Sequence, residues 1–341
     1  MKIALITGIT GQDGVYLAGF LLDRGYEVHG LVRRSSWPNL SRLRELLGEK
    51  AGEVRLHYGD VTDGMSLLKI IGEIKPCEIY NLAAQSFVQA SFEMPCYTGN
   101  VNAMGVVNLL EAVKSVGREM KVYQASTSEM FGNNGCEVQD ESSPMRPCSP
   151  YAAAKLYAYH MTRFYREAYG MFVCNGILFN HESPLRGEEF VTRKITKAVA
   201  EIVAGKEDTL FIGSLDSSRD WGHAADYVRG MWAMMQHDTP DDYVLATGSS
   251  VTVREFVERA FRYVGIVLQW KGSGENEVGK DATSGRVYVR VDKRFYRPAE
   301  LNRLRGDASK ARRVLGWEPT YDLDALVEEM VKTDLRRLGI C

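Results

Sequence analysis

Apolar and polar residues alternate along the first half of the chain in two patterns. Short apolar runs of strand length lie at residues 2–7, 27–32, 54–58, 78–82, 121–125 and 174–178, and segments with helical apolar spacing, such as 15–22, lie between them. Strands and helices in this order are typical of α/β proteins, in which helices cover both faces of a mostly parallel sheet. The pattern therefore predicts an α/β fold with a doubly wound parallel sheet.

The first connection between a strand and a helix is rich in glycine. It reads Gly8-Ile-Thr-Gly11-Gln-Asp-Gly14. Glycines at these positions allow a tight turn, close approach of the backbone to a pyrophosphate and close helix packing, and the first helical amides can bind phosphate. We expect a dinucleotide site here, although three glycines also occur in plain structural turns. The candidate contacts are Gly8, Thr10, Gly11, Gln12, Asp13 and Gly14.

The end of the second strand indicates which nicotinamide cofactor fits. An acidic residue at this point would bind the adenosine ribose of NAD. This chain instead has Arg33, Arg34 and Ser35, and adjacent guanidinium groups suit the 2′-phosphate of NADP. The sequence favours NADP, and a surface loop that happens to be basic is the other interpretation.

Polar segments follow three more of the predicted strands. Because the carboxyl ends of parallel strands lie at one edge of the sheet, where such folds bind ligands, we expect these segments around one crevice. They are Asp60-Val61, Leu82-Ala83-Ala84-Gln85-Ser86 and Ser126-Thr127-Ser128-Glu129.

A tyrosine and a lysine stand four residues apart in a predicted helix. Ser149 suits the cap and Pro150 the first turn, so Tyr151 and Lys155 share one face. An ammonium beside a phenol favours the phenolate, which can act as a general base. The same spacing also occurs on solvated helix faces. The upstream carboxylate of Glu129 suggests a second kind of proton transfer.

Length and composition limit the classes of protein. The 341 residues, 45% of them hydrophobic, can form two domains or one large domain with a lobe. The net charge of −2 argues against nucleic acid as a partner. No apolar run is long enough for a signal peptide or a membrane span, which predicts a cytoplasmic protein with no membrane partner. Six scattered cysteines predict reduced thiols and no metal site.

Several strings together resemble the extended short-chain dehydrogenase/reductase family, and longer strings within them are similar to the GDP-mannose 4,6-dehydratases. The shorter strings are Thr7-Gly8-x-x-Gly11-x-x-Gly14, Asn81-Leu-Ala-Ala84, Tyr151-x-x-x-Lys155 and Arg219-Asp-Trp221; the longer ones include Gln124-Ala-Ser-Thr-Ser-Glu129, Phe179-Asn-His-Glu-Ser-Pro-Leu-Arg186, Phe190-Val-Thr-Arg-Lys-Ile195 and Arg297-Pro-Ala-Glu300. The resemblance implies an NADP-binding, Rossmann-like domain over residues 1–180, with a return segment around 219–248. It implies a smaller α/β lobe for the nucleotide sugar over 181–341.

The resemblance also implies catalytic roles. Tyr151 would take the proton from the hexose 4-hydroxyl as hydride leaves carbon 4, while Lys155 would assist it and hold the cofactor ribose. Thr127 would hydrogen-bond the 4-oxygen. Glu129 would remove the proton at carbon 5, so that the 6-hydroxyl leaves as water before the hydride returns to carbon 6. A strand-end threonine and a solvated loop carboxylate are the structural alternatives for Thr127 and Glu129.

Further residues are assigned to ligands by the same resemblance. His181 and Arg186 are expected at the cofactor, although a buried structural histidine is an alternative. The substrate, GDP-mannose, is expected to contact Ser86, Ser128, Glu129, Asn180, Lys194, Arg219, Arg297 and Glu300. The resemblance implies a homo-oligomer, either a dimer or a tetramer built from dimers.

Two other functions fit parts of the sequence. A reductase or an epimerase acting on nucleotide sugars would share the tyrosine and lysine but would not need a base at carbon 5. A catalytically inactive NADP-binding protein would have no reason to keep Thr127, Glu129, Tyr151 and Lys155 together.

Overall fold

The computed structural model describes residues 1–341 except 37–38, 297–300, 302 and 341. Two compact units are present. Unit 1 comprises residues 1–178, 224–245 and 306–318, and unit 2 comprises residues 179–223, 246–305 and 319–341. The segment 224–245 lies within the return segment expected around 219–248, whereas no sequence pattern indicated the third segment of unit 1.

Unit 1 contains a seven-stranded parallel sheet in the order β11-β6-β5-β4-β1-β2-β3. The strands are β1 (Ile3–Thr7), β2 (Glu27–Val32), β3 (Arg55–Tyr58), β4 (Glu78–Asn81), β5 (Lys121–Thr127), β6 (Val173–Leu178) and β11 (Asp242–Leu245). This order confirms the doubly wound α/β fold, and the chain direction across the sheet reverses between β1 and β4. Ligands of such folds bind at the carboxyl ends of the strands beside that point.

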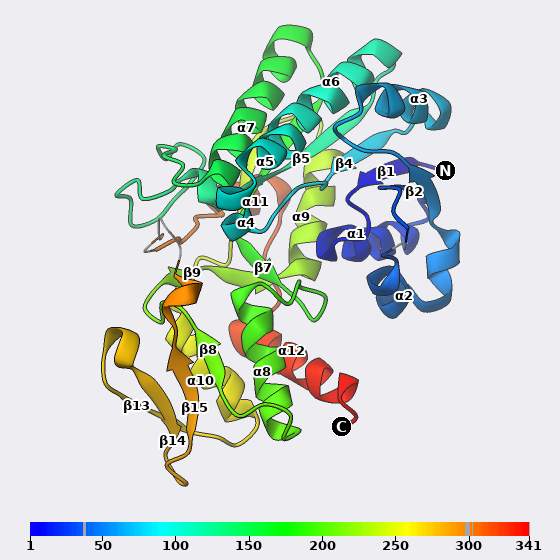
Figure 1. Cartoon of the computed structure of the whole chain (residues 1–341). Helices are drawn as coiled ribbons and strands as arrows, with labels where there is room; N and C mark the ends of the chain where they lie inside the picture. Colours follow the sequence, from blue (N-terminus) through cyan, green and yellow to red (C-terminus); the bar gives the residue numbers. More distant parts are fainter. Residues whose placement is uncertain (37–38, 297–300, 302, 341) are drawn as a thin grey trace. The chain divides into compact units, whose positions relative to one another are not determined.

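Helices cover both faces of this sheet. One layer contains α3 (Gly64–Ile74), α6 (Gly105–Val116) and α7 (Pro150–Tyr169), and the other contains α1 (Gln12–Leu22) and α9 (Ala224–Gln236) (Figure 1). The shorter helices α2 (Ser41–Leu47), α4 (Val88–Glu93), α5 (Pro95–Gly99) and α11 (Ser309–Leu315) complete the unit. A buried cluster that includes Leu5, Ile79, Leu109 and Val122 fills the layer under α3 and α6.

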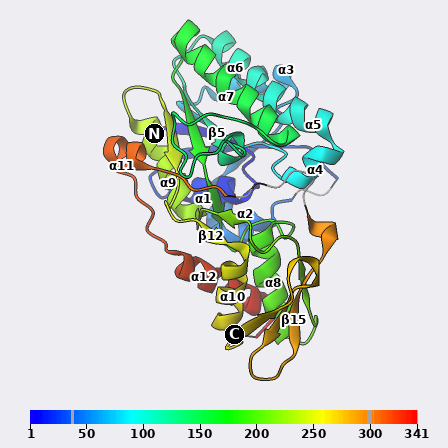
Figure 2. The same cartoon turned by 90° about the vertical axis from the view of Figure 1, so that its left-hand side faces the viewer.

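Unit 2 is a smaller α/β unit. Strands β8 (Leu210–Ile212), β13 (Leu268–Lys271), β14 (Val278–Asp281) and β15 (Val287–Val291) form a sheet in the order β13-β14-β15-β8. The same unit holds the short pairs β7 (Asn180–Glu182) with β10 (Trp221–His223) and β9 (Ser218–Arg219) with β12 (Val251–Thr252). Its helices are α8 (Val191–Val203), α10 (Val253–Tyr263) and α12 (Leu323–Arg337), and they appear with the sheet in Figure 2. Strand β14 lies within the polar, glycine-rich stretch 271–285.

A row of five buried polar residues crosses the sheet of unit 1. The strand register pairs Thr7 with Asn81, Asn81 with Gln124, Gln124 with Asn175, and Asn175 with Asp242. We call these five residues the polar row. Their side chains lie in the core, and none is more than 5% exposed. Buried polar groups are tolerated only where they are hydrogen-bonded, so each must have a partner.

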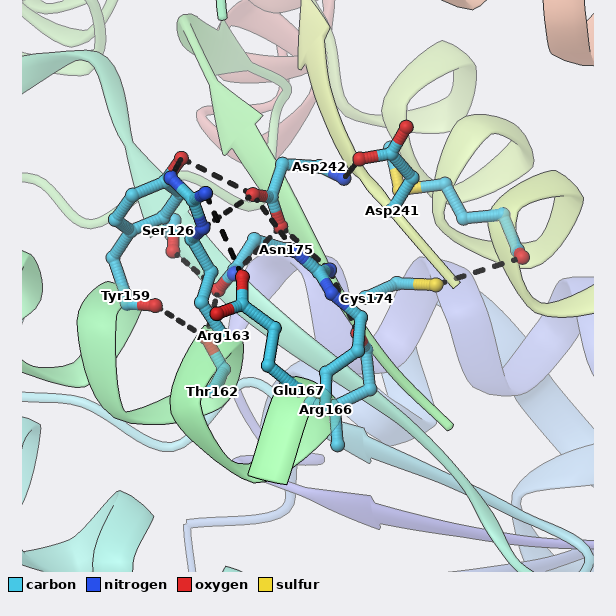
Figure 3. A network of polar contacts seen from close by, with 12 residues as sticks. Ser126, Tyr159, Thr162, Arg163, Arg166, Glu167, Cys174, Asn175, Asp241 and Asp242 are labelled. Atoms are coloured by element: carbon cyan, nitrogen blue, oxygen red, sulfur yellow. Dashed lines mark hydrogen bonds and ion pairs between the residues drawn. The ribbon is translucent and has the colours of Figure 1, made fainter. Parts of the chain in front are cut away.

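The half of the polar row on β6 and β11 is tied to helix α7 (Figure 3). Asn175 donates to Asp242 at 2.9 Å and accepts from Thr162 of α7 at 2.8 Å and from Ser126 of β5 at 3.1 Å. Arg166 of α7 forms two parallel hydrogen bonds with the Asp242 carboxylate, at 2.9 and 3.1 Å. Directional bonds of this kind fix the position of α7 along the sheet more strictly than apolar packing would.

Replacing Asp242 should destabilise unit 1 strongly. Asp242→Ala leaves the half-buried guanidinium of Arg166 without its carboxylate, and an uncompensated charge in such a place costs about 3–5 kcal/mol. Denaturant unfolding measures the loss. Asp23→Ala, which breaks the exposed pair of Asp23 with Lys50, is the matched control and should cost less than about 1 kcal/mol. Equal losses in the two variants would contradict this account of the network.

Candidate functional site

The glycine turn after β1 is built as a dinucleotide site requires. Gly8 has a φ of +69°, and a Cβ there would lie 2.8 Å from the Ala83 amide nitrogen. A Cβ on Gly14 would lie 2.5 Å from the Gly8 carbonyl oxygen. Gly11 is the N-cap of α1 and offers no side-chain hydrogen bond to the first amides. A helix start without a side-chain cap suits a phosphate at the positive end of the helix dipole.

A cavity of about 800 Å³ lies beside the ends of β2 and β3. The predicted cofactor residues that line it are Thr10, Arg33, Arg34, Ser35 and Asp60; Tyr58, Asn39 and Ser66 are lining residues that the sequence did not indicate. The Arg34 guanidinium lies 5.7 Å from the centre of the Tyr58 ring. Arg33, Arg34 and Ser35, the residues expected at the 2′-phosphate, therefore line one cavity together with the exposed ring of Tyr58.

Val61 occupies a different kind of position. Its side chain is buried in the apolar cluster of unit 1, and its carbonyl accepts a hydrogen bond from Asn108 at 3.0 Å. The side chain packs in the core, so only backbone atoms of Val61 are suited to contact a cofactor.

The loop after β4 is fixed at both ends. Thr7 accepts hydrogen bonds from the amides of Leu82 and Ala83, each at 3.1 Å. Asn102 holds Gln85 through two bonds of 2.8 Å, one to its amide and one to its carbonyl. Because a buried asparagine inside a helical stretch gives no distinct sequence signal, this role of Asn102 was not predicted.

The remaining candidates of this loop differ in exposure. The side-chain oxygen of Gln85 is buried and has no hydrogen-bond partner among the described residues, which fits a group that a ligand satisfies. Ala84 is half-buried, and the Ser86 side chain is exposed.

The predicted helix with tyrosine and lysine on one face is confirmed. Ser149 caps α7 by accepting from the Ala152 amide at 3.1 Å, and Pro150 occupies the first turn. Tyr151 and Lys155 are both buried. The Lys155 ammonium donates to the Ala125 carbonyl at 2.8 Å, and burial lowers the pKa of Lys155 to about 8, although the Asp13 carboxylate opposes that shift.

The segment after β5 places a carboxylate beside the same helix. Thr127 caps the short helix η3 (Ser128–Met130) by accepting from the Glu129 amide at 3.2 Å. The helix η3 packs against α7, and the side chains of Thr127, Ser128 and Glu129 are no more than 9% exposed. Glu129 is therefore not a solvated loop carboxylate, which was the structural alternative.

Two substrate candidates of unit 2 have unsatisfied polar atoms. The Lys194 ammonium and the Asn180 side-chain oxygen are buried without a hydrogen-bond partner among the described residues. Lys194 lies over the ring of Phe295, and burial lowers the pKa of its ammonium to about 8. Buried groups without partners cost folding free energy, so they fit a site that a ligand completes.

The other candidates of unit 2 already have protein partners. His181 donates from Nδ1 to the Phe179 carbonyl at 2.8 Å. Arg186 pairs with Glu182 at 3.0 Å and stacks on Phe190. Arg219 is buried and donates to the Leu301 carbonyl at 2.9 Å.

Some features fall outside this site or outside the described residues. Arg297 and Glu300 lie among the residues that the structure does not describe. Within the described part of the chain, no cluster of three or more histidine, cysteine or acidic residues is arranged to hold a metal ion. No helix there is both long and apolar enough to cross a membrane.

The fold is shared with solved structures of modest sequence identity. The dTDP-glucose 4,6-dehydratase of Bacillus anthracis str. Ames in complex with NAD aligns with a TM-score of 0.79 and 22% identity over 97% of this chain and 96% of that one. RMD from Pseudomonas aeruginosa complexed with NADPH aligns with a TM-score of 0.76 and 20% identity over 99% and 100%. The chain thus shares its Rossmann-like fold with these two proteins.

Sequence comparison is more specific. Residues 5–330 match the family described as GDP-mannose 4,6 dehydratase. A GDP-mannose 4,6-dehydratase of Sinorhizobium fredii (strain HH103) is 55% identical over 342 residues, covering 99% of this chain and 97% of the relative, and one of Cricetulus griseus is 53% identical over 340 residues, covering 98% and 91%. The chain belongs to the GDP-mannose 4,6-dehydratase family, a family of hydro-lyases.

Removing the buried ammonium of Lys194 should stabilise the free protein, because no described residue accepts a hydrogen bond from it. Because the folded pKa of Lys194 lies below its unfolded value, the unfolded chain binds more protons between about pH 8 and the ordinary lysine pKa of 10.5. The cost of burying the charge is therefore full below pH 8 and declines as pH rises. Lys194→Met should unfold at a higher temperature than the native chain at pH 7, by an amount that shrinks toward pH 10.

Thermal unfolding across this pH range checks the prediction. Lys197→Met on the same helix is the control, because Lys197 is half-exposed and paired with Glu188. It should give a small loss of stability without the same dependence on pH. A lower unfolding temperature for Lys194→Met at pH 7 would show that Lys194 has a partner in the free protein.

Proposed function

We propose that this chain converts GDP-mannose to GDP-4-keto-6-deoxymannose. The observation that carries the proposal is the buried carboxylate of Glu129 on η3, which packs against the helix of Tyr151 and Lys155. A hydride step alone needs the tyrosine and the lysine, whereas removal of water needs a further base near the same sugar. Family membership supports this combination.

The cofactor proposed for unit 1 is NADP. When bound, it accepts a hydride from carbon 4 and supplies one to carbon 6. The glycine turn and the uncapped first amides of α1 fit its pyrophosphate, and Arg33 and Arg34 line the cavity where a 2′-phosphate would be bound. Guanidinium groups bind phosphate through paired hydrogen bonds. His181 and Arg186 are further proposed contacts.

Each catalytic side chain has a defined task. Tyr151 takes the proton of the 4-hydroxyl, and the ammonium of Lys155 stabilises the resulting phenolate. Thr127 donates a hydrogen bond to the 4-oxygen, which favours the ketone. The ketone acidifies the hydrogen on carbon 5, and Glu129 removes it as the 6-hydroxyl leaves as water.

The nucleotide sugar is proposed to bind polar and charged side chains. Lys194 and Asn180 have the unsatisfied polar atoms that a diphosphate would complete. Arg219, Arg297 and Glu300 are proposed at the nucleotide, and Ser86 and Ser128 at the hexose.

A homo-oligomer, dimeric or tetrameric, is also part of the proposal. Apolar side chains on unit 1 support it: Tyr97, Met104, Tyr157 and Phe164 are 41–49% exposed. A cytoplasmic location stays a prediction.

The proposed reaction is redox-neutral, and this property tests it. Incubation with GDP-mannose and catalytic NADP should yield a 4-keto-6-deoxyhexose nucleotide without accumulation of NADPH, because the hydride taken from carbon 4 returns to carbon 6. Product NMR together with NADPH absorbance checks both statements. Stoichiometric NADPH would point instead to a simple dehydrogenase.

Glu129→Gln separates the dehydratase from a reductase or an epimerase. The amide has the same shape but cannot take a proton, so oxidation at carbon 4 should persist while elimination slows by roughly a hundredfold or more. Dehydration at the native rate in this variant would remove Glu129 from the mechanism.

Cofactor choice can be tested on the two arginines. The double variant Arg33→Ala, Arg34→Ala should weaken NADP binding by roughly tenfold or more and leave NAD binding almost unchanged, because only NADP has the 2′-phosphate. Calorimetric titration with both cofactors measures the difference. Equal weakening would assign these arginines another role.

A further inference from the structure

We propose that Gln124 is a positioning residue that holds the Ala125 carbonyl and, through it, the ammonium of Lys155. This inference rests on the proposed function, in which Lys155 serves Tyr151. It concerns the half of the polar row that lies on β1, β4 and β5.

The contacts form an unbroken chain from the glycine turn to α7. Thr7, the residue before Gly8, donates to Asn81 at 2.6 Å, and Asn81 donates to the Gln124 side-chain oxygen at 2.6 Å. The Gln124 side-chain nitrogen donates to the Ala125 carbonyl at 2.9 Å. Lys155 donates to the same carbonyl at 2.8 Å.

The position of Gln124 in the sheet explains why a side chain is needed here. Strand β4 ends at Asn81, opposite Gln124, whereas β5 continues to Thr127 beside β6. Beyond Gln124, β5 therefore has no β4 backbone on one side. The Ala125 carbonyl lies in this stretch and accepts two side-chain hydrogen bonds, so the side chains of Gln124 and Lys155 supply the donors that the β4 backbone does not.

Gln124 is suited to the task by its length and its two functions. Gln124 is 1% exposed. Its side-chain oxygen accepts a hydrogen bond from Asn81 on β4, and its side-chain nitrogen donates one to the Ala125 carbonyl on β5. A buried amide with both functions engaged has little rotational freedom. Lys155 is 3% exposed, and the Ala125 carbonyl is its hydrogen-bond acceptor in the described structure.

Loss of Gln124 would thus act on the ammonium of Lys155. Without the hydrogen bond from Gln124 the carbonyl would be held less firmly, so the charged form of Lys155 would have a weaker acceptor while it remained buried, and its pKa should fall. The Asp13 carboxylate of α1 is a charged group that acts on this ammonium, and Tyr151 lies one turn earlier on α7. A phenolate at Tyr151 would then be less stabilised, and hydride transfer would slow.

The test compares Gln124→Met with Thr162→Val. Methionine keeps the length of glutamine but lacks both hydrogen bonds. Thr162→Val removes a buried hydrogen bond from the same helix, two turns beyond Lys155, and leaves the Ala125 carbonyl untouched. Both variants should lose some stability.

Two readouts distinguish positioning from general destabilisation. The first readout is NMR of the substrate-free protein with lysine labelled with ¹³C at the ε-carbon, in which the Lys155 signal is assigned by its loss in Lys155→Met. The Lys155 pKa should be lowered by roughly one unit in Gln124→Met and unchanged in Thr162→Val. With GDP-mannose, Gln124→Met should lower kcat by roughly tenfold while KM changes less than about twofold. Thr162→Val should keep both constants within about twofold.

The outcomes are separable. An unchanged Lys155 pKa in Gln124→Met, or equal effects in the two variants, would overturn the positioning role whether or not GDP-mannose is the substrate. A native chain inactive toward GDP-mannose would instead refute the proposed function, and the titration would still decide on Gln124.

If Gln124→Met does not fold, Gln124→Glu serves the same test. The protonated carboxyl can still accept from Asn81 and donate to the Ala125 carbonyl, whereas the carboxylate cannot donate. Its kcat relative to the native chain should therefore fall as pH rises. A ratio that does not depend on pH would overturn the proposal.

Discussion

The structure of unit 1 depends on burying one positive charge beside its central sheet. The Lys155 ammonium is almost fully enclosed, and an enclosed charge must be hydrogen-bonded or it would lose its proton. Among the described residues, the Ala125 carbonyl accepts from it, at the point where β5 extends past β4. The Gln124 side chain donates to the same carbonyl, on the side that the end of β4 leaves open.

This constraint links the reaction to the fold more closely than the Tyr151–Lys155 spacing does. Helix α7 is bound to the sheet at two levels, by Lys155 near its start and by Thr162 and Arg166 further along. Because the bonds are directional, α7 cannot slide without breaking several of them. Glu129 lies on a short helix that packs against α7, so its position also depends on where α7 lies. A rigid frame suits a reaction in which one sugar must present carbon 4, carbon 5 and carbon 6 in turn.

The sequence predicted the features that depend on local pattern. Strands and helices of unit 1 appear as continuous apolar runs and periodic stretches, and the glycine turn and the Ser149-Pro150 start of α7 have local physical causes. The polar row could not be predicted in this way. Asn175 and Asp242 are polar residues inside strands, and only the register of strands far apart in sequence brings them together. The segment 306–318 joins unit 1 through tertiary contacts alone, for the same reason.

Buried polar groups in the two units also differ in a way that separates positioning from binding. The amides of the polar row have protein partners on both sides, so they are satisfied before any ligand arrives. Lys194 and Asn180 of unit 2, and Gln85 of unit 1, keep buried atoms without hydrogen-bond partners among the residues that the structure describes. Folding alone does not favour such atoms, because each costs free energy that a protein partner would have removed. A ligand that supplies the missing partners recovers this free energy on binding, and a group satisfied in the free protein has none to recover. We therefore infer that the polar row positions the site and that the unsatisfied atoms bind its ligands.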